Sequence, residues 1–304
     1  MKFTLLITFI LTTAIQSAAA CDISEKQLVV RTSLIQAQNA EINSFVGPLN
    51  RNNDDEESNL SKKDFNRLID AVKKVYVPIF KAQRMNFRIE SQWEDKQVNA
   101  FAGTRGSDRY ILLYGGYARH KLMTKDAYLS VLCHEIGHHL GGFPKKTSSA
   151  WSSSEGQADY FSTLKCMKEV LREDKDNEEI ALALDLPQDV KKQCRFQYSN
   201  PNDYFICLRS AQAAEDHGKV IEDIETKGTE SYVSLMTPSV EKVLTTNLKH
   251  PDSQCRADTK LQGALCNVST KIALDDYDET IGSCTFNNFN IIGNRPACWF
   301  VHKK

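Results

Sequence analysis

The stretch His134-Glu135-Ile136-Gly137-His138 constrains this chain more than any other part of its sequence. On a helix, residues i and i+4 share one face, so both imidazoles can bind a single cation. Zinc suits neutral imidazole nitrogens, and three protein ligands leave a fourth position for a water whose pKa falls to about 7. Glu135 is placed to accept that water's proton. A chance match in a chain of this length arises on the order of 1% of the time, so a zinc site is favoured over a coincidental helix.

The helix that carries this motif is expected to run from about Lys125 to Leu140. Thr124 is a good N-cap residue, and Gly141-Gly142 supplies a left-handed stop. The segment is apolar over much of its circumference, which predicts a buried helix whose histidines line an internal cleft.

A third metal ligand is needed, and two patterns compete for it. The metzincin pattern requires a final histidine where this chain has Pro144, which cannot bind zinc. The alternative is Glu155 on a second helix, with Asp159 at i+4 placed to hold a ligand histidine by its other nitrogen. The run from Ser152 to Glu155 also reads as a capping box, in which Glu155 would fold back onto its own helix start. For Glu155 considered alone, the capping box would be the preferred interpretation. Because the chain also contains His-Glu-x-x-His, the interpretation of Glu155 as a metal ligand is preferred.

Five short segments in a fixed order resemble the gluzincin metallopeptidase family, which contains the CAAX-prenyl endopeptidases and soluble periplasmic proteases of outer-membrane quality control. The resemblance covers roughly residues 85 to 260. The segments are Asn99-Ala100-Phe101-Ala102, Tyr114-Gly115-Gly116-Tyr117, His134-Glu135-Ile136-Gly137-His138, Glu155-x-x-Ala158-Asp159, and His250-Pro251 followed by Arg256.

The resemblance implies peptide-bond hydrolysis by a zinc-activated water. In this interpretation Zn²⁺ is held by His134, His138 and Glu155, and Glu135 is the general base. His250 is expected near the metal, as an oxyanion stabiliser or as a reversible ligand that blocks the open position. Asp159 and Arg256 are expected to lie next to the metal ligands without binding the metal themselves.

The edge of the active-site cleft is expected to be formed by a strand of four residues, Asn99, Ala100, Phe101 and Ala102. It would pair with an extended polypeptide substrate through main-chain hydrogen bonds, which favours unfolded or flexible chains. An alternative from another class is a catalytically silent or autoinhibited zinc protein that binds extended segments as a chaperone does. A purely structural zinc site would close its fourth position and would have no use for Glu135.

The N-terminus has the three-part plan of a secretory signal peptide: Met1-Lys2, the apolar run from Phe3 to Ile15, and the small residues from Ser17 to Ala20. Cleavage is expected near Ala20, so residues 1–20 would be removed. Cys21 would then be either the lipidated first residue of a bacterial lipoprotein or an ordinary cysteine of a secreted protein. Such a lipid is the only link to a membrane that the sequence leads us to expect. The predicted location is periplasmic or extracellular.

The cysteine content supports export to an oxidising compartment. Of nine cysteines, eight remain without Cys21, an even number compatible with four disulfides. The simplest pairings are Cys255 with Cys266, Cys284 with Cys298, and Cys194 with Cys207, although eight cysteines allow 105 arrangements. The formal net charge of −1 gives no indication of nucleic-acid binding.

The predicted fold class is α+β and zincin-like, with a small, mainly antiparallel sheet packed on the active-site helix, further helices, and a disulfide-braced C-terminal segment. Helices are expected from Glu25 to Phe45 and from Ser61 to just before Pro78. Strand-like composition marks Asn86 to Trp93, Val98 to Ala102 and Arg109 to Tyr114. The expected organisation after the signal peptide is an N-terminal helical segment (21–84), a peptidase core (85–265) and a cysteine-containing cap (266–304).

Overall fold

The computed structural model describes residues 60–147, 151–228, 232–286 and 292–302. The predicted signal peptide, Cys21 and the predicted helix from Glu25 to Phe45 lie outside these residues. The described elements, in chain order, are α2 (Lys62–Ala82), β1 (Asn86–Gln92), β2 (Ala100–Arg105), β3 (Asp108–Tyr114), α3 (Gly115–Ala118), α4 (Lys125–Leu140), α5 (Glu155–Phe161), the π-helix η1 (Ser162–Cys166), α6 (Met167–Leu171), α7 (Asn177–Leu182), α8 (Gln188–Gln197), α9 (Pro201–Thr226) and α10 (Ser253–Leu265).

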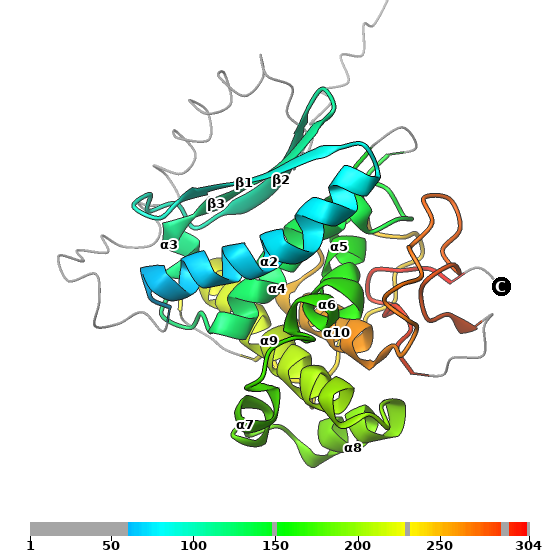
Figure 1. Cartoon of the computed structure of the whole chain (residues 1–304). Coiled ribbons are helices and arrows are strands. Elements are labelled where there is room, and N and C mark those ends of the chain that lie inside the picture. Colours follow the sequence, from blue (N-terminus) through cyan, green and yellow to red (C-terminus); the bar gives the residue numbers. More distant parts are fainter. Residues whose placement is uncertain (1–59, 148–150, 229–231, 287–291, 303–304) are drawn as a thin grey trace, which may run out of the picture.

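The elements are arranged in layers around the motif helix α4 (Figure 1). The sheet forms one side of the molecule, α2 and α4 lie beneath it, and α5, α9 and α10 lie beyond α4. The largest apolar cluster joins α2, the inner face of the sheet, α4 and part of α9, and it includes Phe65, Ile111, Leu132, Ile136 and Val220. The fold is therefore α+β, with α4 buried at its centre.

The sheet is small, as predicted, but its strands are mixed rather than mainly antiparallel. Its order is β1-β3-β2: β2 pairs with β3 antiparallel, whereas β1 pairs with β3 parallel. The tight turn at Gly106, where φ is +62°, returns the chain from β2 directly into β3 and makes that pair antiparallel. Strand β1 pairs with the other edge of β3 and runs in the same direction as β3.

The helix predicted to end before Pro78 continues through it to Ala82. Proline removes one helical hydrogen bond. Pro78 is on the exposed side of α2, where the carbonyl left without a partner can be hydrated. Beyond it, Phe80 is fully buried and stacks on Phe87 with ring centroids 4.3 Å apart. The burial of Phe80 explains why the helix extends past the proline.

Helix α4 has the predicted bounds, Lys125–Leu140. Thr124 caps it by accepting a hydrogen bond from the amide of Ala127 at 3.2 Å. The chain leaves the helix through Gly142, which has a φ of +70°. The segment predicted to be helical from about Ser153 to Arg172 is the continuous run α5–η1–α6, interrupted by one π-helical turn.

Four disulfides form, as the even number of cysteines predicted: Cys133–Cys166, Cys194–Cys207, Cys255–Cys298 and Cys266–Cys284. The predicted Cys194–Cys207 pair is confirmed, but the pairs Cys255–Cys266 and Cys284–Cys298 are wrong. Cys255 and Cys266 lie at opposite ends of α10, about 16 Å apart at 1.5 Å per residue, which is too far for a disulfide. The four bonds indicate an oxidising compartment.

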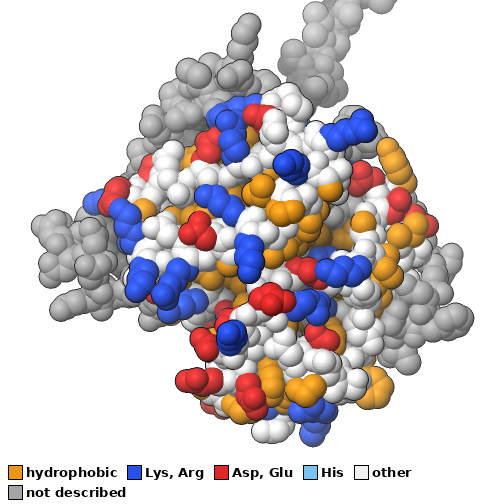
Figure 2. Space-filling model, in the orientation of Figure 1, with side chains coloured by type: hydrophobic (Ala, Val, Ile, Leu, Met, Phe, Trp, Pro, Cys, Tyr) orange, Lys and Arg blue, Asp and Glu red, His pale blue; other side chains and the backbone are white. Residues whose placement is uncertain are grey.

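Basic and acidic side chains are interspersed on the face of the molecule shown in Figure 2. The described residues include no helix that is both long and apolar enough to cross a membrane.

Candidate metal centre

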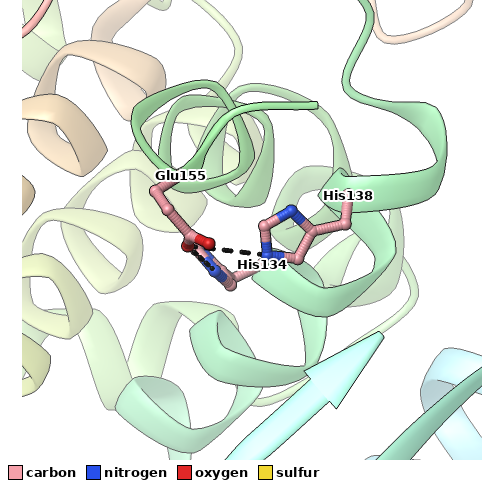
Figure 3. A group of neighbouring side chains, drawn as sticks. All are labelled: His134, His138 and Glu155. Atoms are coloured by element: carbon pink, nitrogen blue, oxygen red, sulfur yellow. Dashed lines mark ion pairs between the residues drawn. The ribbon is translucent and has the colours of Figure 1, made fainter. Parts of the chain in front are cut away.

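Three buried side chains from two helices converge on one point (Figure 3). His134 and His138 project from α4, and Glu155 projects from the first position of α5. Their ligand atoms all lie within 4.8 Å of one another. Glu155 Oε2 is 3.2 Å from His134 Nε2 and 3.6 Å from His138 Nε2. These residues, called the ligand set below, are the three that the sequence predicted.

Both histidines are held with Nε2 facing the carboxylate. The Nδ1 atom of His134 donates to Asp159 Oδ1 at 2.8 Å, and the Nδ1 atom of His138 donates to the carbonyl oxygen of Ser153 at 3.0 Å. A neutral imidazole with its proton on Nδ1 presents a lone pair at Nε2. In its neutral form, each ring therefore presents a lone pair toward an oxygen that is also an acceptor.

This donor set fits a cation. His138 is fully buried, and its Nε2 atom has no hydrogen-bond partner among the described residues. Burial lowers the pKa of His138 well below its ordinary value, which favours the neutral form that binds metal. Two imidazole nitrogens and a carboxylate are ligands typical of zinc, with a fourth position left for water. A cation between these three groups would satisfy all of them.

Glu135 lies next to the ligand set but is not part of it. Its side chain is nearly buried, and Oε2 has no hydrogen-bond partner in the described part of the chain. Burial raises the pKa of Glu135 to about 7. Oε2 of Glu135 is thus an acceptor beside the ligand set to which no described group donates a hydrogen bond.

Asp159 connects the ligand set to buried positive charge. It accepts two hydrogen bonds from Arg256, at 2.7 and 3.1 Å, and Lys260 Nζ lies 3.4 Å away. Burial opposes the charged form of Asp159, but Arg256 and Lys260 hold its pKa well below its ordinary value. Asp159 is therefore a carboxylate that accepts from His134, and the structure places Arg256 against it.

His250 also lies at the ligand set, although it follows α9 by more than twenty residues. Its Nε2 atom is 2.9 Å from Glu155 Oε2, and its side chain is 53% exposed. On the other oxygen of Glu155, Lys146 forms an ion pair at 2.7 Å.

The capping-box alternative for Glu155 does not describe this helix start. The N-cap residue of α5 is Ser154, whose side chain makes no capping hydrogen bond. Ser152 Oγ instead lies 3.2 Å from His138 Nδ1. The Glu155 side chain faces the histidines, which leaves it available as a ligand.

The segment predicted as the substrate edge lies on β2, beside α4. Strand β2 is an edge strand, because only β3 pairs with it within the described sheet. Ala100 and Ala102 face the inner core, and Phe101 points to the opposite side with Tyr110 and Tyr114. Asn99 directly precedes the strand, and its side chain accepts a hydrogen bond from the amide of Ala100 at 2.9 Å.

Sequence reasoning missed several groups that act on the ligand set. Lys146 carries no motif signal, and the carbonyl of Ser153 contributes through the backbone, which no side-chain pattern reveals. Lys260 lies four residues after Arg256 on α10, so helical spacing from Arg256 could have indicated it. The disulfide next to His134, Cys133–Cys166, was also missed.

Comparison with known proteins gives one match. The model of peptidase family M48 matches residues 62–185, a range that includes the whole ligand set and Glu135 but ends before His250 and Arg256. Searches of curated proteins and of solved structures found no significant match. The resemblance drawn from the motifs is confirmed for this range. Residues 62–185, which build the candidate metal centre, match the model of peptidase family M48, a family of zinc metallopeptidases that includes the CAAX prenyl proteases.

Proposed function

We propose that this protein is an exported zinc-dependent endopeptidase that cleaves unfolded or extended polypeptides. The observation that carries the proposal is the convergence of His134, His138 and Glu155 beside the unpaired carboxyl oxygen of Glu135. Three ligands and an adjacent general base are what a hydrolytic metal site needs, whereas a purely structural site has no use for the base.

When bound, zinc would polarise the scissile carbonyl and lower the pKa of the attacking water. Protein side chains and backbone groups would transfer the proton and orient the metal ligands. Glu135 would accept the water proton and later deliver it to the leaving nitrogen. Asp159 and the Ser153 carbonyl keep His134 and His138 in the tautomer that presents Nε2.

The substrate class is inferred from β2. An edge strand has unpaired amide and carbonyl groups along one side, so an extended peptide can add to it as a further strand. Main-chain pairing depends little on side-chain identity. We therefore infer a preference for flexible chains over a particular residue sequence.

Two roles are proposed for His250, and its short distance to Glu155 supports either of them. It could stabilise the oxyanion of the transition state, or it could occupy the open metal position and silence the enzyme. The 2.9 Å contact with a ligand oxygen is the specific observation that keeps an autoinhibited or silent zinc-binding protein as the second candidate function. Its exposure, 53%, leaves room for the ring to move away.

Export is inferred from the predicted signal peptide and the four disulfides. We propose a periplasmic or extracellular location. Lipid on Cys21 remains one of the two proposed fates of the mature N-terminus.

The test is zinc content together with casein cleavage, compared between the wild type and Glu135→Gln. The variant removes a proton acceptor and no ligand, so we expect one bound zinc per chain in both proteins and cleavage by the wild type alone. Equal cleavage by both proteins would refute the peptidase assignment. Zinc in both and cleavage by neither would favour the silent zinc-binding protein.

A further inference from the structure

We propose that the C-terminal segment 295–301, called the tether below, holds His250 at the metal centre. The inference rests on the proposed function only in taking the ligand set as the metal site. The tether lies outside the range that matches the peptidase family, and no motif in the sequence indicates it. It contacts both the segment that leads to His250 and the helix that provides Glu155.

The first set of contacts is with residues 243–247, a few positions before His250. The amide of Val243 donates to the carbonyl oxygen of Ala297 at 2.9 Å, and the amide of Asn247 donates to that of Trp299 at 2.7 Å. The amide of Val301 donates to Thr246 Oγ1 at 3.1 Å. These three hydrogen bonds, two between backbone groups and one from the tether backbone to the Thr246 hydroxyl, fix this segment along the tether.

The second set of contacts is with α5. Trp299 is fully buried, and its ring covers Gly156 so closely that a Cβ atom there would lie 2.3 Å from it. The Nε atom of Arg295 donates to Gln157 Oε1 at 2.7 Å. The tether thus packs on the two residues that follow Glu155, and its position relative to the ligand set is fixed.

A covalent bond completes the arrangement. Cys298 of the tether is joined to Cys255 at the start of α10, five residues after His250. The chain around His250 is consequently held on both sides, at residues 243–247 by hydrogen bonds and at residue 255 by a disulfide. A side chain that is half exposed would otherwise spend much of its time in water, because ordering an exposed ring costs conformational entropy. The tether offsets that cost and keeps His250 at 2.9 Å from Glu155.

The sharpest variant is Asn247→Pro, which removes the amide that donates to Trp299. It also removes the side-chain oxygen that accepts from the amide of Lys249 at 3.0 Å, so its effect is measured relative to Asn247→Ala, which loses only that second contact. The matched proline control is Thr245→Pro, an exposed position whose amide has no partner among the described residues. In the metal-free protein we expect faster amide hydrogen exchange across residues 243–250 for Asn247→Pro and no comparable change for the control. In the zinc-loaded protein we expect zinc release to a chelator to accelerate about fivefold, which corresponds to one hydrogen bond of about 1 kcal/mol.

The disulfide gives an independent variant. Cys255→Ala/Cys298→Ala should accelerate exchange at 243–250 and zinc release in the same direction. The control, Cys194→Ala/Cys207→Ala, removes the bond between α8 and α9 and should change neither. If the first double variant does not fold, the decision rests on Asn247→Pro, which leaves every disulfide intact.

A positioning role also predicts that the tether acts only through His250. In a His250→Ala background, Asn247→Pro should give no further acceleration of zinc release. Unchanged exchange and zinc release in Asn247→Pro would overturn the proposal, as would an undiminished effect in the His250→Ala background. Hydrogen exchange in the metal-free protein needs no peptidase activity, so its result stands even if casein is not cleaved.

Discussion

Cys133, the residue before His134, is bonded to Cys166 on the continuous helix that begins with Glu155. Their Cα atoms are 5.4 Å apart. This bond joins the helix that provides two members of the ligand set to the helix that provides the third. A covalent link between the two elements that build the candidate metal centre therefore restrains its geometry.

We expect Cys133→Ala/Cys166→Ala to lower the free energy of unfolding by about 4 kcal/mol, because the bond closes a long loop in the unfolded chain. Urea denaturation of the metal-free protein measures this. The shorter Cys194–Cys207 loop provides the control, with an expected loss of about 3 kcal/mol. A smaller loss for the Cys133 pair than for the control pair would contradict the prediction. Zinc affinity should fall for the Cys133 pair alone.

Glu155→Ala should abolish stoichiometric zinc binding and activity, because it removes a ligand that faces both histidines. Asp159→Ala should be milder and lower zinc affinity about 10- to 100-fold, the range found when a group that orients a ligand histidine is lost. Competition with a chelator of known affinity measures both variants. Full zinc occupancy in Glu155→Ala would remove Glu155 from the ligand set.

His250→Ala should speed zinc release, since the ring contacts a ligand oxygen. Its effect on kcat separates the two proposed roles. Loss of an oxyanion stabiliser lowers kcat about 10²- to 10³-fold, whereas loss of a blocking ligand raises it. Casein cleavage and chelator kinetics on this one variant give both quantities. If neither changes, His250 has no role at the metal.

Pro78→Ala should raise the free energy of unfolding by about 2 kcal/mol. Alanine restores a hydrogen bond inside α2 and relieves the clash of the proline ring, and the greater freedom of the unfolded chain offsets part of that gain. Thermal unfolding of the metal-free protein checks this, with Val77→Ala, also exposed on α2, as the control. A lower melting temperature for Pro78→Ala would show that the proline is accommodated without cost.

The motif helix could be predicted to the residue because its signals are local. Thr124 and Gly142 act on the turns next to them, and the spacing of His134 and His138 is a property of any helix. The same holds for Glu155 and Asp159, which helical spacing placed on one face. Local rules therefore predicted which side chains meet at the candidate metal centre.

The features that sequence reasoning got wrong depend on distant parts of the chain. In the sequence, Pro78 indicates the end of a helix. The helix continues to Ala82 because Phe80, beyond the proline, is buried in the core, and the sequence alone does not show that burial. The parallel pairing of β1 depends on the connection between β1 and β2, which carries the chain past β3 to its other edge. Cys255 and Cys266 are close in sequence but separated by the length of α10, so their partners had to come from elsewhere. These choices depend on the tertiary structure, which no local pattern contains.

Every disulfide lies at or beyond residue 133, since the sequence has no cysteine between residues 22 and 132. The ligand side of the site is thus cross-linked, whereas α2 and the sheet are held to it only by noncovalent contacts, such as the Lys125–Asp64 ion pair and the hydrogen bond between His139 and the Tyr110 carbonyl. Segments without cross-links open at lower free energy than the braced core. We expect the position of β2 to shift when polypeptides of different bulk bind beside it. The distances between the three candidate metal ligands should stay the same for all of them.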